Sequence, residues 1–139
     1  MSEGYFTVEP DQLDSYTLVE LAQAHATPLH CIGLDLSGQD LARAQLAGAF
    51  FERCFFSETD FTAADLTGTR WLSCRAGSAN FRSATLTEAR FERCDLNNTR
   101  WQRGKLAHGV FEGCKLTGAN FSDVSALGVS FTDCLLNSG

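Results

Sequence analysis

The residues of this sequence whose type and spacing could support chemistry are five of its six cysteines. Cys54, Cys74, Cys94, Cys114 and Cys134 follow one another at intervals of twenty residues. A disulfide needs Cβ atoms that face each other, and a zinc site needs ligands that converge on one point. Side chains at one fixed spacing instead form a line and point in one direction. We therefore interpret this cysteine column as small, reduced thiols in the core.

The remaining reactive side chains are scattered. Cys31 is interpreted as lying outside the register of the repeat described below, and the sequence gives it no role. His25, His30 and His108 have no nucleophile or paired base at a related position. Catalysis generally needs converging groups in a pocket. We therefore predict no catalytic residue, no metal site and no cofactor, and we expect the protein not to be an enzyme.

The cysteine spacing is a multiple of a five-residue repeat. Its centres, position i, fall at residue 36 and at every fifth residue to 136, and they are nine Leu, eight Phe, two Trp and two Ala. Position i−2 holds only Ala, Cys, Thr, Gly or Val from Ala44 to Cys134. Neither a helix nor a strand has a period of five. A chain that turns a corner every five residues, and closes a four-sided coil every twenty, explains both spacings.

Several of the five-residue units carry a family resemblance. Ala-Asp-Leu-Thr-Gly at 64–68, Ala-Asn-Phe-Arg-Ser at 79–83 and Ala-Arg-Phe-Glu-Arg at 89–93 resemble the A(D/N)LxX units of pentapeptide-repeat proteins. The resemblance covers about residues 29–137. It implies that family's all-β fold, a right-handed quadrilateral parallel β-helix of about five coils. It also implies a function, because members of the Qnr and MfpA group protect or inhibit DNA gyrase, a type II topoisomerase, by resembling duplex DNA.

A rod of this kind exposes an apolar cross-section at each end, and both ends need a cap. We divide the chain into an acidic N-terminal segment, 1–28, and a pentapeptide-repeat β-helix, 29–139. Thr17 and Glu20 form a capping box that predicts a short helix at 18–26, which Pro28 ends and which seals the first coil. The sequence shows no comparable cap near residue 139. Either a second copy of the chain meets that end, giving a homodimer, or a longer protein continues there.

The charge is distributed unevenly along the chain. The net charge is −6, yet seven of the 17 carboxylates precede Arg43, whereas all 11 Lys and Arg side chains are at or after it. The rod is therefore nearly neutral, and its stretch 70–105 is basic. DNA mimicry would need carboxylates such as Asp40, Asp60 and Asp65 to align on one wall. Nucleic acid is not an expected ligand either, because acidic residues interrupt the basic stretch.

Outward positions of the repeat provide a candidate interaction surface. Exposed apolar side chains often mark contact surfaces, and arginines can bind an acidic partner. Two alternatives remain: the N-terminal segment folds over Phe50 and Phe55, and the arginines form solvated ion pairs with glutamates of neighbouring coils. The predicted surface consists of Phe50, Phe55, Arg70, Leu72, Arg90, Arg93, Leu127 and Leu135.

The sequence as a whole favours a non-enzymatic protein–protein interaction or scaffold module, whose protein partner it does not identify. The alternative is a DNA mimic that binds or protects DNA gyrase. No apolar run reaches the roughly 18 residues that suggest a membrane span, and the first residues lack the features of a signal peptide. We therefore expect a bacterial protein that does not contact a membrane and is either cytoplasmic or exported by a route without a classical signal.

Overall fold

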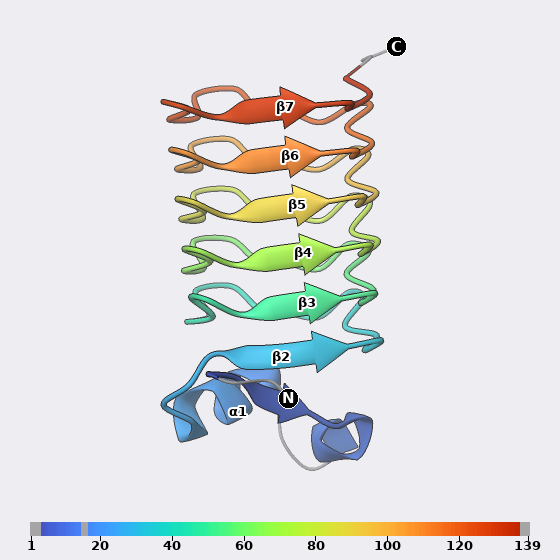
Figure 1. Cartoon of the computed structure of the whole chain (residues 1–139), viewed down its shortest axis with the longest axis vertical. Helices are drawn as coiled ribbons and strands as arrows, with labels where there is room; N and C mark the ends of the chain where they lie inside the picture. The colour runs from blue at the N-terminus through green and yellow to red at the C-terminus, as the bar shows by residue number, and fades with distance from the viewer. Residues whose placement is uncertain (1–3, 15–16, 137–139) are drawn as a thin grey trace.

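The computed structural model describes residues 4–14 and 17–136. A strand β1 (Phe6–Val8), a 3-10 helix η1 (Pro10–Asp14) and a helix α1 (Leu18–Ala24) come first. Six further strands follow: β2 (Leu29–Ile32), β3 (Phe50–Glu52), β4 (Arg70–Leu72), β5 (Arg90–Glu92), β6 (Val110–Glu112) and β7 (Ser130–Thr132). All seven strands form one parallel sheet in sequence order, stacked along the long axis of the molecule (Figure 1).

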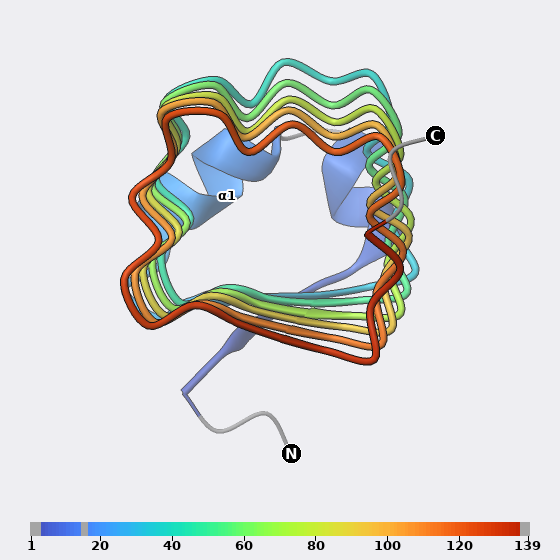
Figure 2. The same cartoon turned by 90° about the horizontal axis from the view of Figure 1, so that it is seen from above.

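The solenoid has four sides when it is viewed along its axis (Figure 2). Strands β2 to β7 form one side, which we call wall A. Isolated parallel bridges between residues twenty apart form the other three: wall B runs from Asp35 to Leu135, wall C from Asp40 to Asn120, and wall D from Gln45 to Ser125. The parallel four-sided β-helix predicted from the two periods is therefore confirmed.

Each corner of the solenoid depends on a residue in the left-handed region. Every i+2 residue from Gly33 to Asp133 has a φ between 50° and 76°. At one such corner Ser83 has a φ of 58°, and the amide of Ala84 donates to the carbonyl of Phe81 at 3.1 Å. This is a β-turn with a positive φ at its third residue. Fourteen of these 21 residues are not glycine, so residue type alone does not predict the conformation at each corner.

The Asp or Asn at position i−1 has a structural role in the same turns. Oδ1 of Asp60 accepts a hydrogen bond from the amide of Thr62 at 2.9 Å, and Oδ1 of Asn80 accepts one from Arg82 at 3.0 Å. A short polar side chain that bonds the amide two residues on stabilises a turn. The repeat thus favours Asp or Asn at i−1 because its side chain satisfies a backbone amide.

The core consists of the inward positions. Every centre from Leu36 to Leu116 is buried, and so is every i−2 residue from Ala44 to Cys114. Aromatic centres stack on one another: the ring centroid of Phe91 lies 5.0 Å from that of Trp71 and 5.1 Å from that of Phe111. These contacts confirm which residues of the repeat face inward.

Cys31 corrects one interpretation made from the sequence. It is fully buried and pairs in register with Phe51 of the next coil, so it occupies a centre position. The five-residue repeat therefore begins one unit before Leu36. The sequence concealed this because the residue two places before Cys31 is Leu29, which is larger than the small residues at i−2 from Ala44 onward.

The N-terminal segment caps the first coil, as the sequence predicted. The side chain of Thr17 accepts from the amide of Glu20 at 3.1 Å, and Glu20 Oε1 accepts from the amide of Thr17 at 2.8 Å. Helix α1 ends at Ala24, two residues before the predicted end, because His25 is extended. Leu18 and Leu21 are buried against the core. This arrangement shields the apolar cross-section from water.

Strand β1 was not predicted. It pairs with β2 in parallel, with Phe6 opposite Leu29, and so covers the first edge of the sheet. β1 and β2 share one sheet although the predicted domain boundary after residue 28 lies between them; that boundary stays a prediction.

The other end of the described solenoid is open. Phe131 and Leu136 are centres, yet they are 41% and 52% exposed. Leu127 and Leu135, which face outward, are 78% and 59% exposed. The last described coil therefore presents an apolar surface. No helix within residues 4–14 and 17–136 has the length and apolar character needed to cross a membrane.

Candidate interaction surface

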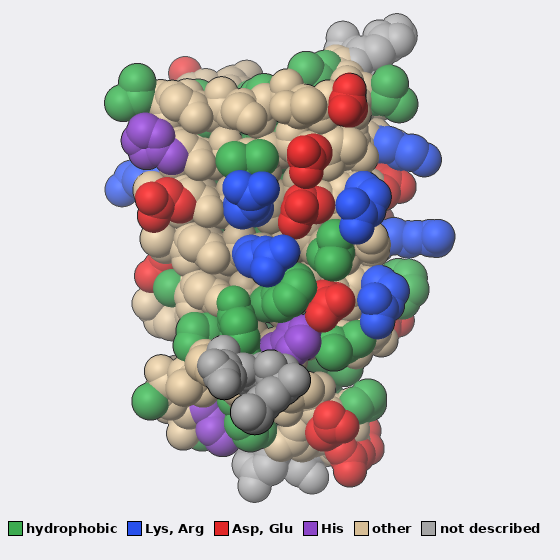
Figure 3. All heavy atoms as spheres, viewed as in Figure 1, with side chains coloured by type: hydrophobic (Ala, Val, Ile, Leu, Met, Phe, Trp, Pro, Cys, Tyr) green, Lys and Arg blue, Asp and Glu red, His purple; other side chains and the backbone are tan. Residues whose placement is uncertain are grey.

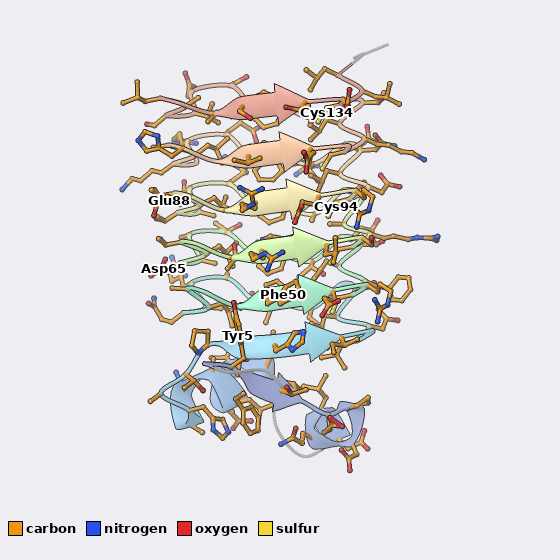
Figure 4. All side chains as sticks on the ribbon, in the orientation of Figure 1. Tyr5, Phe50, Asp65, Glu88, Cys94 and Cys134 are labelled. Atoms are coloured by element: carbon orange, nitrogen blue, oxygen red, sulfur yellow. The ribbon has the colours of Figure 1, made fainter. Side chains whose placement is uncertain are left out.

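The cysteine column lies inside the solenoid, at the corner between walls A and B. Figure 4 shows Cys94 and Cys134 at the same end of β5 and β7. Each thiol donates to a carbonyl of the preceding coil; Sγ of Cys74 lies 3.3 Å from the carbonyl oxygen of Phe51, and Sγ of Cys94 lies 3.3 Å from that of Trp71. No cysteine of the chain is in a disulfide. The column therefore packs the core, as we interpreted it from the sequence.

Cys31 is buried next to this column. Burial raises the pKa of its thiol to about 12, so it stays protonated at neutral pH. Within the described residues, no group of three or more His, Cys, Asp or Glu side chains is placed to hold a metal ion. The side chains available for recognition are therefore those on the outer walls.

Phe50 is partly covered by the N-terminal segment. Figure 4 shows Tyr5 close to Phe50 on wall A, and their ring centroids are 6.1 Å apart. The ring of His30 stacks on Phe50 at 4.8 Å, and the guanidinium of Arg70 lies 4.5 Å from the centroid of the same ring. Phe50 is thus half-buried. The sequence left open that the N-terminal segment folds over Phe50. The structure shows that it does.

Phe55 differs from Phe50. It lies on wall B and is 41% exposed. In the twenty-residue columns it follows Asp35 and precedes Arg75, so no aromatic ring stacks on it along the rod. Phe55 is the most exposed phenylalanine in the interior coils of the described solenoid.

The predicted arginines divide into paired and unpaired side chains. Arg70 lies 3.5 Å from Glu92 of the next coil, which is the cross-coil pairing expected from the sequence. Arg90 and Arg93 are exposed and make no ion pair with any described residue. Leu72 is half-buried on wall A. The structure therefore leaves Arg90 and Arg93 able to bind an external partner.

Sequence reasoning missed two basic residues beside Arg93. Arg75 and Lys115 lie on wall B, on either side of Asp95 in the same column. A hollow at the corner between walls A and B is lined by Ser73, Arg75, Arg93, Asp95, Gly113 and Lys115. Figure 3 shows basic side chains along this edge of the molecule, at the right of the view. Arranging the outward positions in columns of twenty residues, as was done for the core, would have grouped Arg75 and Lys115.

The carboxylates do not form one acidic wall. Asp40 and Asp60 are adjacent in the column of wall C, but that column continues with Asn80, Arg100 and Asn120. Asp65 lies on wall D, in a column that also contains Lys105. The alignment that DNA mimicry would need therefore holds for Asp40 and Asp60 and fails for Asp65.

The fold and the repeat together define a class of protein, the parallel β-solenoids built from five-residue units. Residues 24–101 match the family model for the pentapeptide repeat region, and residues 104–137 match that for pentapeptide repeats in eight copies. The chain belongs to the pentapeptide repeat family. The resemblance recognised from the sequence is confirmed.

The solved structure of QnrB1 supports this assignment. QnrB1, a plasmid-mediated fluoroquinolone resistance protein, is 28% identical over 69% of this chain and 48% of its own, with a TM-score of 0.66. This chain thus spans about half the length of QnrB1. A pentapeptide repeat protein from the thylakoid lumen of Arabidopsis thaliana is 30% identical over 66% of this chain and 64% of its own, with a TM-score of 0.41. Comparison with curated protein sequences gave no significant match.

Proposed function

We propose that this chain is a non-enzymatic protein–protein interaction module. The exposure of Phe55, on a wall that also carries the unpaired Arg75, is the observation that carries the proposal. Aromatic and arginine side chains are enriched at the energetic centres of protein interfaces. An aromatic side chain that is 41% exposed within a regular wall is available to such a partner.

The backbone supports the same proposal, because it holds outward side chains in fixed positions. In the column of wall B, the amide of Arg75 donates to the carbonyl of Cys54 at 3.0 Å, and the amide of Phe56 donates to the carbonyl of Arg75 at 2.7 Å. Similar bonds join each coil to the next. A rigid surface loses little conformational entropy when a partner binds it.

The proposal is tested by identifying a partner and measuring the effect of one side chain on its affinity. The full chain is immobilised, captured proteins are identified, and the affinity of the purified partner is measured by calorimetry. Phe55→Ala should weaken binding by about tenfold or more. Thr85→Ala, at the same register position on wall D, is the matched control. Equal affinities for Phe55→Ala and the unaltered chain would remove Phe55 from the interface.

A second candidate is binding or protection of a type II topoisomerase by DNA mimicry. The likeness to QnrB1 favours it, and so does the adjacent pair Asp40 and Asp60. The basic residue Arg100 in the same column weighs against it. We therefore place it second to the interaction module.

A gyrase supercoiling assay, with and without a fluoroquinolone, tests this second candidate. If mimicry operates, the chain protects or inhibits the enzyme, and Asp40→Asn with Asp60→Asn removes the effect. These substitutions keep the turn hydrogen bonds, because Asn80 makes the same bond as Asp60. Absence of any effect at micromolar protein would reject the candidate. Homodimer formation through the C-terminal end stays a prediction, which a strict monomer in light scattering would contradict.

A further inference from the structure

We propose that the corner between walls A and B binds an acidic, extended segment of the protein partner. This inference rests on the proposed function and assigns the chemistry of the partner. We call the site the basic corner and define it by Arg75, Arg93 and Lys115, with Phe55 as its apolar neighbour. Three features carry the proposal: the shape of the hollow, its unpaired charge and its position beside Phe55.

The hollow brings side chains of three successive coils together. Ser73, Arg93 and Gly113 occupy the same corner position in those coils. A Cβ placed on Gly113 would lie 3.5 Å from Cγ of Arg93, so the aliphatic stem of Arg93 passes beside Gly113. Arg93 therefore extends toward the coil that carries Lys115. The small side chains above and below Arg93 leave the space that a ligand can occupy.

The charge of the basic corner is not neutralised. Asp95 lies between Arg75 and Lys115 in the column of wall B. Its Oδ1 accepts a hydrogen bond from the amide of Asn97 at 3.1 Å, which uses the carboxylate within its own turn. Within the described residues, none of the three cations makes an ion pair. Three cations and one engaged carboxylate therefore line the hollow, while Glu92 and Glu112 lie outside this lining on wall A. A ligand with negative charge opposite the cations complements them.

The spacing of the corner fits an extended peptide. Successive coils are separated by the roughly 4.8 Å of paired strands, so Arg75 and Lys115, two coils apart, are about 10 Å apart along the rod. A segment in the extended polyproline II conformation has three residues per turn and advances roughly 3.1 Å per residue. Two acidic side chains three residues apart therefore lie on one face of such a segment, about 9 Å apart, and match these two cations. Phe55, one coil before Arg75, adds a contact for an apolar side chain next to them.

A nucleic acid fits the corner less well than an acidic peptide. Asp95 lies within the hollow, and Glu92 and Glu112 follow one another on wall A beside it. A phosphate backbone carries a negative charge on every nucleotide and would meet these carboxylates. A peptide can place its acidic residues opposite the cations and neutral residues opposite Asp95. The geometry therefore favours the peptide.

The test is fluorescence anisotropy at low salt with the full chain and a short labelled peptide that carries a Leu next to Glu residues three apart. The peptide should bind, and the same peptide with Gln in place of Glu should bind about tenfold more weakly. Arg75→Glu, Arg93→Glu and Lys115→Glu together should also reduce the affinity by about tenfold or more. The matched control is Arg43→Glu, Arg100→Glu and Arg103→Glu, which makes the same change of net charge at exposed positions of wall C and of the corner between walls C and D.

The control triple variant should keep the affinity of the unaltered chain within about threefold, and circular dichroism should show both triple variants folded. Equal losses of peptide affinity in the two triple variants would show a long-range charge effect and would overturn the proposed site. No binding at millimolar protein would overturn it too. If an oligothymidylate of equal charge binds the corner more tightly than the Glu peptide, the ligand is a phosphate backbone, and the peptide assignment is wrong.

Failure of this inference can be distinguished from failure of the proposed function. A purified partner that loses affinity for Phe55→Ala, yet binds the corner triple variant normally, would keep the interaction module and reject the basic corner. A chain that binds the Glu peptide through the corner, yet captures no protein, would keep the corner and count against the module.

Discussion

Nε1 of Trp71 donates a hydrogen bond of 2.9 Å to Oγ1 of Thr69 inside the core. The hydroxyl of Thr69 in turn donates to the carbonyl of Leu66 at 2.7 Å. The second tryptophan repeats this arrangement, because Nε1 of Trp101 lies 2.7 Å from Oγ1 of Thr99. A buried N–H without a partner is costly. Threonine at i−2 thus allows tryptophan to occupy a centre of this repeat.

The first prediction concerns this pair. Thr69→Ala leaves the indole N–H of Trp71 unsatisfied and should lower the free energy of unfolding by about 1–3 kcal/mol. The measurement is urea denaturation followed by circular dichroism. Phe at the centre needs no partner, so Thr69→Ala should cost less in a Trp71→Phe background. Equal costs in the two backgrounds would show that the hydrogen bond is unimportant.

Removal of an aromatic ring tests the inward columns. Phe91 is buried and stacks on Trp71 and Phe111, so Phe91→Ala should cost about 3–5 kcal/mol of unfolding free energy. Phe131→Ala, at the open end where the ring is 41% exposed, should cost distinctly less. Thermal and urea denaturation provide the values. A cost below about 1 kcal/mol for Phe91→Ala would contradict the register.

The left-handed corners give a third prediction. Ser83 has a φ of 58°, a region in which a β-branched residue is strained. Ser83→Val should therefore destabilise the fold by about 1–2 kcal/mol, while Ser83→Ala should be nearly neutral because both residues carry a Cβ. Ser83→Gly should be at least as stable as Ser83→Ala. Urea midpoints in any other order would argue against the positive φ.

The pH dependence of Asp35 gives a fourth prediction. The amide of Ser37, at 3.0 Å from Oδ1, and the Ser37 side chain donate to the carboxylate and lower the pKa of Asp35 below its ordinary value of 3.8. Because the folded pKa is below the unfolded one, the stabilisation is present above the unfolded pKa and is lost as pH falls through the folded pKa.

The variant Asp35→Asn isolates this effect, since an amide oxygen accepts the same hydrogen bond and does not titrate. The unaltered chain should be the more stable of the two at neutral pH, and its advantage should shrink as pH falls below 3.8, the ordinary pKa of an Asp side chain. Urea midpoints of both proteins across this range provide the measurement. An advantage that persists unchanged in acid would contradict the cause assigned to the lowered pKa.

The sequence predicted those features that depend on residue type. The five-residue period located the inward residues, and Thr17 with Glu20 located the cap, because apolarity and capping are properties of individual side chains. The left-handed corners were not predictable, since 14 of the 21 corner residues, Arg, Ser, Glu and His among them, are not glycine. Strand β1 was missed because three residues are too few to show a strand pattern.

The candidate interaction surface was predicted less completely than the core. Phe55 was identified, because an aromatic residue at an outward position is conspicuous. Arg75 and Lys115 were not, since forty residues separate them and only the stacking of coils brings them to one hollow. The covering of Phe50 by Tyr5 depends on how the N-terminal segment crosses wall A. No local pattern specifies that path.

Each residue of a wall pairs with the residue twenty positions further along, as Asn80 pairs with Arg100. The length of the rod is therefore set by the number of twenty-residue coils. Duplication of twenty residues would add one coil and leave every wall in its place. Duplication of five would instead rotate all later residues by one wall and interrupt each outward column at that point. Because each coil contacts mainly its neighbours, stability should change by similar steps as coils are added. A recognition surface on such a rod can therefore grow in steps of twenty residues without a new fold.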